Sequence, residues 1–407
     1  MEPIEYANLY VEKYTNRNLL LDFIVEREYI YFRNNGDYTE SMKLLQYTPS
    51  MLLFQNVENL PISEGDIISV SMQSFIRHKE NANRAHFDNT DGNEVPYNLF
   101  MTFSDGDWLA ERFHVGEAFK RNRLRKQLTD RVVETWPNGT PCSLNNTYNN
   151  ICIEVVDVGQ GSTNLIYDGN ALTIFDFGAS IFASKPVLKN IVDDIRVRFH
   201  RFHGASLIIS HWDCDHYNLL TVLDEELMRQ LCCVFVPSEI ITLTSKQIMN
   251  QLQNNCRYIR AFSSPAAKKG RSAEIVPVIT KPNYVLYVGA KSKDTNKSGF
   301  ALTIKSKQEV TILGADHTNR QIWEYIYPHT VANKSYERLH IVVPHHGGSC
   351  GKIKIKSLSE RPGIAAISVG KNSYKHPHQP TMSTYSNLGF NVKRTDWERQ
   401  KIFFQMK

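Results

Sequence analysis

The stretch LIISHWDCDHYNLL, residues 207–220, is an apolar run that ends in a cluster of possible metal ligands. Four such ligands fall within six positions: His211, Asp213, Asp215 and His216. Packing explains them poorly, because carboxylate groups are seldom buried without a partner. The preceding run ASLIIS, residues 205–210, predicts a strand that is buried on both faces and ends at His211. The stretch therefore predicts a layered α/β domain with a metal site at the mouth of this strand.

Three later segments have the same design of an apolar strand followed by possible ligands. They are TILGADH (311–317), IVVPHHGG (341–348) and ISVGKNSYKHPH (367–378). Taken alone, Asp316 is compatible with a helix N-cap and His376 with a surface histidine. Four such segments in one domain instead predict that their ends converge at one rim of a sheet sandwich.

Composition bounds the class of protein. With 407 residues, 42% of them hydrophobic and 22% charged, the chain has room for two or three globular domains. No apolar stretch approaches the roughly 18 residues of a membrane span, and the polar start MEPIEYANLYVEKY does not resemble a signal peptide, so we expect a cytoplasmic protein without a membrane partner. Seven cysteines without a C-x-x-C motif argue against a disulfide framework and a cysteine zinc knuckle.

The pattern along the chain predicts two domains. Residues 1–136 form an N-terminal domain of mixed α+β type, with expected strands at YIYFR (29–33) and DIISVSM (66–72). PNGTPCSLNNTYNN (137–150) is typical of a linker. Residues 151–407 form the α/β domain, which begins with a meander of three strands between 151 and 178. Within it we expect amphipathic helices around 187–195 and 219–231.

A helix is also expected over 116–136, and it contains a group of basic residues. Five of them are candidates for contacts with nucleic acid: Lys120, Arg121, Arg123, Arg125 and Lys126. One interpretation is a solvated helix face, and the other is a stripe that contacts phosphates. The net charge of +5 is compatible with a polyanionic ligand. The N-terminal domain is thus a candidate for binding substrate or a protein partner.

Five motifs in a fixed order support a family resemblance. They are DVGQG (157–161), HWDCDH (211–216), ILGAD (312–316), VPHHGG (343–348) and SVGKNSYKHPH (368–378). This order resembles the metallo-β-lactamase superfamily and is especially similar to the ComEC-type nuclease domain. The resemblance covers residues 151–407 and implies an αβ/βα four-layer sandwich with a two-metal site. The superfamily's separate histidine ahead of its bridging aspartate is missing here, and NKSG (296–299) lies nearby.

The resemblance also implies roles for individual residues. His211 and Asp213 would hold one metal ion, Asp215 and His216 the second, and Asp316 would bridge the two. Either His345 or His346 would complete a ligand shell, and spacing does not decide between them. His376 would lie at the site as a ligand, a phosphate contact or a proton donor, and His378 is a weaker candidate.

Further residues are candidates for supporting the centre. Asp157 and Gln160 lie in a motif that predicts a tight turn, and both are candidates for contacts behind the ligands. Asp176 of the FDFG sequence is expected to buttress the ligands or a turn. Lys375 is a candidate for stabilising charge on a phosphoryl group.

The donor set itself indicates a chemistry. A carboxylate at Asp213 shifts preference from zinc toward manganese or magnesium, so we expect two divalent ions, Mn²⁺ or Zn²⁺, with Mg²⁺ as an alternative. Two such ions stabilise attacking and leaving oxygens in phosphoryl chemistry. Asp215 and His376 are the expected catalytic residues.

Three functions remain open from the sequence. The first is a metal-dependent phosphodiester hydrolase, namely a DNA nuclease. The second is a hydrolase of the same fold that acts on a small phosphoester or cyclic nucleotide. The third is a non-catalytic, metal-stabilised interaction module.

Overall fold

The computed structural model describes most of the chain in two compact units. The described residues are 3–15, 17–36, 47–57, 60–79, 82–84, 99–104, 109, 129–134, 151–169, 171–202, 204–267, 274–292, 294–331, 336–355, 357–370, 372, 375–398 and 401–407. The first unit comprises residues 1–132, 181–187 and 239–252, and the second comprises 133–180, 188–238 and 253–407. The expected linker and the basic residues Lys120, Arg121, Arg123, Arg125 and Lys126 lie outside the described residues.

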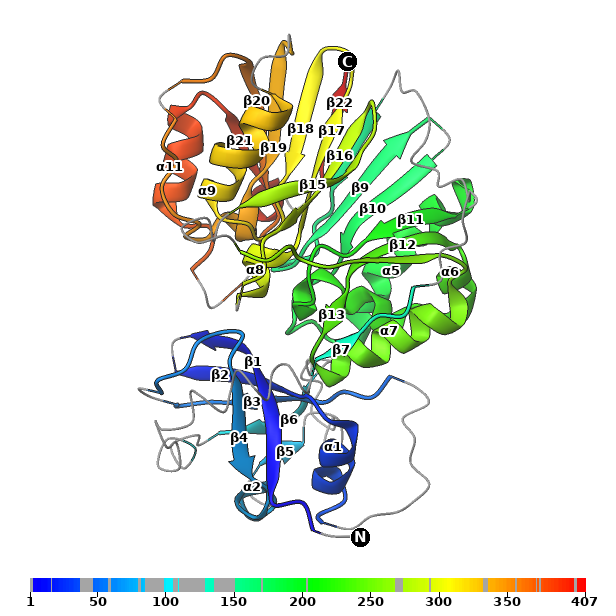
Figure 1. The fold of residues 1–407 in the computed structure, drawn as a ribbon, viewed down its shortest axis with the longest axis vertical. Helices are drawn as coiled ribbons and strands as arrows, with labels where there is room; N and C mark the ends of the chain where they lie inside the picture. The colour runs from blue at the N-terminus through cyan, green and yellow to red at the C-terminus, as the bar shows by residue number, and fades with distance from the viewer. Residues whose placement is uncertain are drawn as a thin grey trace. The chain divides into compact units, whose positions relative to one another are not determined.

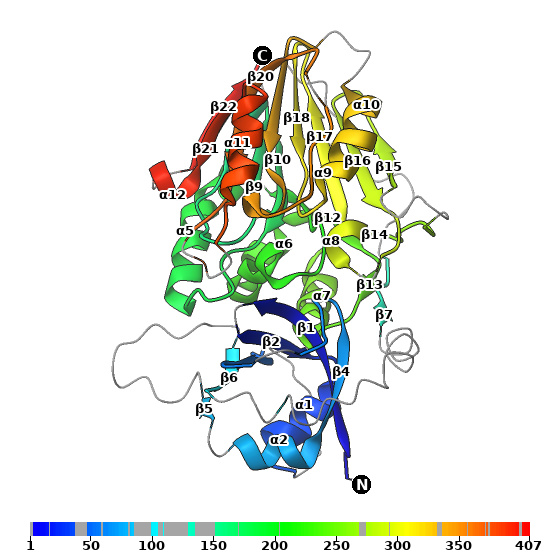
Figure 2. The same cartoon turned by 90° about the vertical axis from the view of Figure 1, so that its left-hand side faces the viewer.

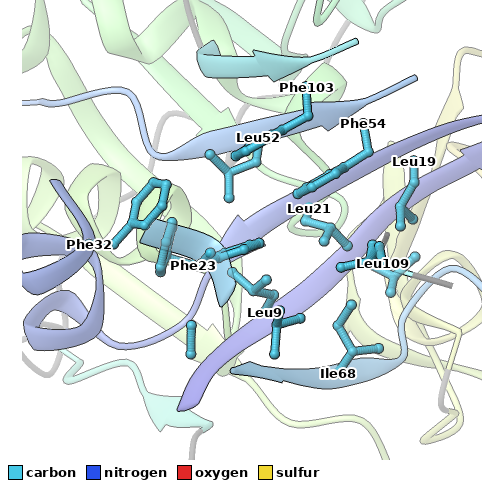
Figure 3. Packing of buried hydrophobic residues seen from close by; sticks show 14 of the residues in the cluster. Leu9, Leu19, Leu21, Phe23, Phe32, Leu52, Phe54, Ile68, Phe103 and Leu109 are labelled. Carbon is cyan, nitrogen blue, oxygen red and sulfur yellow. The ribbon is translucent and has the colours of Figure 1, made fainter. Parts of the chain in front are cut away.

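The first unit is built on a six-stranded sheet with the order β4-β1-β2-β3-β6-β5. Its strands are β1 (Tyr6–Thr15), β2 (Asn18–Phe23), β3 (Met51–Phe54), β4 (Ile67–Ser71), β5 (Asn83–Arg84) and β6 (Leu99–Phe103). Two helices, α1 (Glu26–Arg33) and α2 (Met72–Lys79), accompany them, and β7 (Asp130–Arg131) pairs with β13 (Glu239–Ile240). Figure 3 shows its apolar core, in which the rings of Phe54 and Phe103 stack with centroids 4.5 Å apart.

The second unit contains two seven-stranded sheets. The first has the order β14-β12-β11-β10-β9-β8-β22 and the second β15-β16-β17-β18-β19-β20-β21. The strands of the first are β8 (Ile151–Val155), β9 (Thr163–Asp168), β10 (Ala171–Phe177), β11 (Ala205–Ile208), β12 (Leu231–Pro237), β14 (Ile259–Phe262) and β22 (Ile402–Met406). Those of the second are β15 (Ile275–Thr280), β16 (Tyr284–Gly289), β17 (Phe300–Lys305), β18 (Glu309–Leu313), β19 (Arg338–Val342), β20 (Arg361–Ile367) and β21 (Asn391–Arg394). In each sheet an antiparallel part continues into a parallel part, as β8-β9-β10 and β10-β11-β12 illustrate.

Helices cover the outer faces of these sheets (Figures 1 and 2). They are α5 (Lys185–Arg201), α6 (Glu225–Arg229), α9 (Asn319–Gln321), the π-helical turn η5 (Ile322–Ile326), α10 (Tyr327–Thr330) and α11 (Gln379–Asn387). The chain also contains α7 (Leu243–Asn255), of which residues 243–252 belong to the first unit, and the short helices α8 (Thr295–Ser298) and α12 (Thr395–Glu398). Strand β16 shows how both faces of a sheet are buried. Its Leu286 packs between the two sheets, whereas Val285 and Tyr287 pack beneath η5 and α10. The expected αβ/βα four-layer sandwich is therefore confirmed.

Three local predictions are wrong. The helix expected over 116–136 does not include its described part, residues 129–134, because Asp130 and Arg131 form strand β7 and pair with β13. The segment 29–33, expected to be a strand, belongs to helix α1, because Tyr29 and Phe32 lie three positions apart on one face and both contact Phe23. The helix expected over 219–231 is divided into the 3₁₀ turn η4 (Asn218–Val222) and α6. Asp224 separates them, since its side chain accepts a hydrogen bond from the Leu227 backbone and so begins a new helix.

Two further observations concern the cysteines and the helices. The six cysteines that the structure describes are all free, and four of them are buried. Among the described residues, none of the helices combines the length and apolar character that crossing a bilayer requires.

Candidate metal centre

The predicted ligands lie where parallel strands of both sheets end. Residues 209–216 follow β11, and the aspartate and histidines of the second sheet follow β18 and β19. Because β18 and β19 are parallel, their carboxyl ends share one edge of the sheet. The two sheets also meet here, since the backbone N–H of Phe300 donates to the carbonyl of Ser210 at 2.8 Å. Six predicted ligands are buried at this rim: His211, Asp213, Asp215, His216, Asp316 and His346.

Three imidazole–carboxylate pairs form the centre. Their Nε2–Oδ distances are 3.4 Å for His211–Asp213, 3.3 Å for His216–Asp316 and 3.6 Å for His346–Asp215. Two groups each bring three donor atoms within 4.8 Å of one another: His211, His216 and Asp316, and Asp215, His216 and His346. The carboxylates and imidazoles thus alternate around a common space.

The donor atoms fit a divalent cation. The Nε2 atoms of His211, His216 and His346 are buried and form no hydrogen bond within the part of the chain that the structure describes. A buried nitrogen without a partner is destabilising, so such atoms call for a ligand. Ligand atoms about 2.1 Å from one tetrahedral ion lie roughly 3.4 Å from each other, which matches the spacing of the three pairs.

His216 is oriented from behind by a carboxylate. Its Nδ1 lies 2.8 Å from Oδ2 of Asp176, whose Oδ1 accepts a hydrogen bond from the Ser210 backbone at 2.7 Å. Asp176 lies at a register shift between β10 and β9 and has a φ of 61°. This bulge turns its side chain toward the rim, where sequence alone placed it as a buttress. An acceptor on Nδ1 leaves the Nε2 lone pair of His216 available to a metal ion.

The two adjacent histidines of VPHHGG have different partners. Nδ1 of His346 lies 3.0 Å from the carbonyl of Ser368, so it donates there and leaves Nε2 as the acceptor that faces Asp215. Nδ1 of His345 lies 2.6 Å from Oδ2 of Asp316. The geometry therefore favours His346 as the ligand and places His345 behind the aspartate.

Protonation equilibria reflect the density of negative charge. Burial lowers the pKa of His216, but the carboxylates of Asp316 and Asp176 outweigh this effect and raise it well above its usual value. Burial likewise raises the pKa of Asp316, but His345 and His216 hold it well below its usual range. The centre thus stabilises positive charge between its carboxylates, as a cation site must.

Several side chains of the centre depend on unusual backbone conformations. Positive φ angles occur at Asp176, Ala315, His345, His346 and Lys375, none of which is glycine. Such conformations are unfavourable for L-residues and gather at functional sites.

A glycine permits close packing behind the ligands. A Cβ added at Gly178 would lie 2.0 Å from the carbonyl oxygen of Asp215, so only glycine fits there. Gly178 belongs to the FDFG sequence, and it lets the ligand loop approach β10.

Two of the remaining predicted residues, Gln160 and His378, lie beside the ring of His376. Gln160 contacts its ring, with Nε2 of Gln160 3.1 Å from Nδ1 of His376. The ring of His378 lies 5.3 Å away, and Lys375 is exposed. Asp157 accepts a hydrogen bond from its neighbour Gly159 at 3.4 Å, which is a contact within its own turn. Burial, followed by the nearby His345, His346 and His378, lowers the pKa of His376 to about 3.

Sequence analysis missed two residues that support ligands. The hydroxyl of Ser210 lies 2.9 Å from Nδ1 of His211. The hydroxyl of Thr295 donates to Oδ1 of Asp213 at 2.9 Å. Thr295 directly precedes NKSG, the segment near which the superfamily's separate histidine is missing. A threonine in a polar loop carries no spacing signal that could have identified it.

Comparison with known proteins finds solved structures of low similarity. No family model matches the sequence, and no curated protein matches it. Among solved structures, YhfI from Bacillus subtilis, a metallo-β-lactamase fold protein, is 10% identical with a TM-score of 0.36, over 63% of this chain and 100% of its own. The short form of human tRNase Z is 8% identical with a TM-score of 0.36, over 63% and 98%. Zn²⁺-bound PqqB from Methylobacterium extorquens is 8% identical with a TM-score of 0.36, over 63% and 99%. What the centre does must be inferred from its own side chains.

Proposed function

We propose that the second unit is a metal-dependent phosphodiester hydrolase of the metallo-β-lactamase superfamily, and that its substrate is DNA. The observation that supports this most directly is the set of three buried Nε2 atoms, each facing a carboxylate at 3.3–3.6 Å without a hydrogen bond. Such an arrangement has no function in packing and suits divalent cations.

The ligands divide between two positions. His211 and Asp213 would hold one ion, and Asp215, His216 and His346 the other. Asp316 would bridge them, because one of its oxygens lies within 4.8 Å of donor atoms of both His211 and His216. His345 holds its other oxygen, Oδ2. Three carboxylates among six ligands favour Mn²⁺ or Mg²⁺, while the imidazoles keep Zn²⁺ compatible with the site.

Bound ions would supply a nucleophile at neutral pH and neutralise charge on a phosphoryl group. The protein's own residues would do the rest. Asp176 and Thr295 hold His216 and Asp213 in their orientations. His376 would donate a hydrogen bond to a phosphoryl oxygen. Its pKa of about 3 leaves the imidazole neutral at pH 7, so it would act as a neutral donor and not as an imidazolium. The exposed ammonium of Lys375 would attract the anionic substrate.

DNA is the proposed polymer because a polyanion suits both the cations of the centre and the exposed Lys375 beside His376. The basic residues between Lys120 and Lys126 would add contacts to its phosphates. The identity of the polymer is a separate proposal from the type of reaction, and the binding experiment in the Discussion tests it.

The test compares substrates and metals in one panel. Linear single- and double-stranded DNA, RNA and a chromogenic phosphodiester are each incubated with the full chain under Mn²⁺, Mg²⁺ or Zn²⁺. We expect cleavage of DNA that is lost in Asp316→Asn and kept in Asp193→Asn, whose carboxylate is 65% exposed on α5. Thermal unfolding confirms that both variants are folded.

The other outcomes distinguish the alternatives. Turnover of the small ester alone would replace DNA by a small phosphoester or cyclic nucleotide. Stoichiometric metal binding without turnover of any substrate would leave a metal-stabilised interaction module.

A further inference from the structure

His376 is fixed by two amide side chains. Its backbone N–H donates to Oδ1 of Asn372 at 3.0 Å, and Nδ2 of Asn372 donates back to the His376 carbonyl at 3.0 Å. Its ring is held by Gln160 at 3.1 Å, from a turn 216 positions away in the sequence. The backbone position of His376 and the orientation of its ring are thus set independently.

The turn that carries Gln160 has little freedom to move. Gly370 lies so close that an added Cβ would be 2.5 Å from Cα of Gly159 and 3.3 Å from the backbone nitrogen of Gln160. The side chain of Gln160 is itself buried, with 5% of its surface exposed. Gln160 is therefore a rigid partner for the imidazole.

This contact has a polarity. The amide nitrogen of Gln160 can only donate, so Nδ1 of His376 must accept and the ring proton must be on Nε2. With the amide in this orientation, the buried atom left without a hydrogen bond is the carbonyl oxygen Oε1. The reverse orientation would leave the NH₂ group in that place, and a buried donor without a partner is rarer than a buried acceptor.

The Nε2 atom of His376 lies beside Gly348, in the loop that contains His345 and His346. A Cβ added at Gly348 would lie 2.7 Å from Nε2 of His376 and 2.6 Å from Cδ2 of His345. The rings of His376 and His345 are 5.3 Å apart. A side chain at position 348 would therefore collide with the Nε2 edge of His376, and glycine allows the ring to lie against this loop.

We propose that Gln160 is a positioning residue that selects the Nε2–H tautomer of His376 and so aims a hydrogen-bond donor at the phosphoryl group. This inference rests on the proposed phosphodiester hydrolysis for its role, but the tautomer itself does not depend on activity. No proton is transferred, because the imidazole acts only as a donor to an oxygen whose negative charge increases in the transition state.

The decisive variant is Gln160→Glu, which has the same shape and the opposite polarity. A carboxylate can only accept, so it requires a proton on Nδ1, and in the neutral ring this leaves a lone pair on Nε2. Nitrogen-15 NMR of the metal-free full chain reports which ring nitrogen carries the proton, and His376→Ala identifies the resonance. We expect the Nε2–H form in the wild type and the Nδ1–H form in Gln160→Glu. An Nδ1–H wild type, or a tautomer that does not change, would overturn the proposal.

Kinetics test the role in the reaction. With metal content equal, we expect Gln160→Glu to lower kcat about 10²-fold with little change in KM. The same substitution in a His376→Ala background should have no further effect. If the two effects are additive instead, Gln160 does not act through His376. If the tautomer switches as expected but no phosphodiester is cleaved by the wild type, the proposed function fails and the structural assignment of Gln160 stands.

Discussion

Nδ1 of His216 lies 2.8 Å from Oδ2 of Asp176, and both side chains are fully buried. This pair joins the ligand loop after β11 to the end of β10. Since the Asp176 carboxylate also accepts from the Ser210 backbone, it holds the loop as well as the imidazole. The pair should therefore govern metal affinity without contacting the metal.

Asp176→Asn tests this expectation. The amide cannot accept at both positions, so His216 should lose its orientation and metal affinity should fall roughly 10- to 100-fold. Titration of the metal-free protein against a competing chelator measures the change. Asp193→Asn serves as the matched control, and equal affinities for the two variants would show that Asp176 does not orient the ligand.

The two adjacent histidines should differ sharply on substitution. His346→Ala removes a donor that faces Asp215, so one of two equivalents of metal should be lost. His345→Ala removes only the hydrogen bond to Asp316 and should lower affinity while keeping both equivalents. Elemental analysis after gel filtration counts the metal, and the opposite ranking would reverse the assignment.

Gly178→Ala should prevent the ligand loop from closing. The new Cβ would lie 2.0 Å from the Asp215 carbonyl, and such overpacking destabilises by about 1–3 kcal/mol or more. At Gly169 an added Cβ meets nothing within 4 Å, and the backbone is left-handed with a φ of +53°. Gly169→Ala should therefore lower the free energy of unfolding only by the strain of a left-handed alanine, about 1 kcal/mol. Urea unfolding measures the stability of the two glycine variants, and elemental analysis measures their metal content. Wild-type metal binding in Gly178→Ala would contradict the close approach.

The N-cap of α6 gives a pH-dependent prediction. Partial burial raises the pKa of Asp224, but hydrogen bonds from the Leu227 backbone and the Arg196 guanidinium outweigh it and lower the pKa. Because the pKa is lower in the folded state, the ionised carboxylate stabilises the fold at pH values above the unfolded-state pKa of about 3.9. This contribution is lost as the pH falls through the folded-state pKa. Asp224→Ala should lower the free energy of unfolding by about 1 kcal/mol at pH 7.

Asp224→Asn separates the cap from its charge. It keeps an acceptor for Leu227, so its loss at pH 7 should be smaller than that of Asp224→Ala. Urea unfolding should show the wild type and Asp224→Asn converging at acid pH. A difference that persists after the carboxyl is protonated would exclude the charge as its cause.

The basic segment before the second unit should contribute salt-dependent binding. Replacing Arg121, Arg123 and Arg125 by glutamine should weaken DNA binding. The slope of log K against log salt should become shallower by nearly one for each phosphate that these side chains no longer neutralise. Fluorescence anisotropy over a salt series measures this slope. An unchanged slope would remove these residues from the DNA-binding surface.

The sequence predicted most of the second unit because its strands are continuous apolar runs. Runs such as ASLIIS and YVLYVG lie in central strands buried on both faces, and the ligands directly follow the runs. Convergence at one rim follows from parallel strands alone.

Other features depend on geometry that spacing does not express. The choice between His345 and His346 is set by two successive left-handed residues, which turn neighbouring side chains toward different partners. The first unit includes residues 239–252 because Thr244 donates its backbone N–H to Asp22, across 222 positions. A contact of that separation leaves no local pattern.

The ligand loops come from different sheets: residues 211–216 follow β11 of the first, whereas Asp316 and His346 follow β18 and β19 of the second. Cations bound between these loops would cross-link the two sheets. The stabilisation that they provide would depend on the concentration of free metal ion. A hundredfold excess over Kd would add about 2.7 kcal/mol to the resistance against opening. Chelation should therefore expose amides at this rim to hydrogen exchange before those at the opposite end. Loss of the metal would thus destabilise the edge of the sandwich that carries the proposed activity.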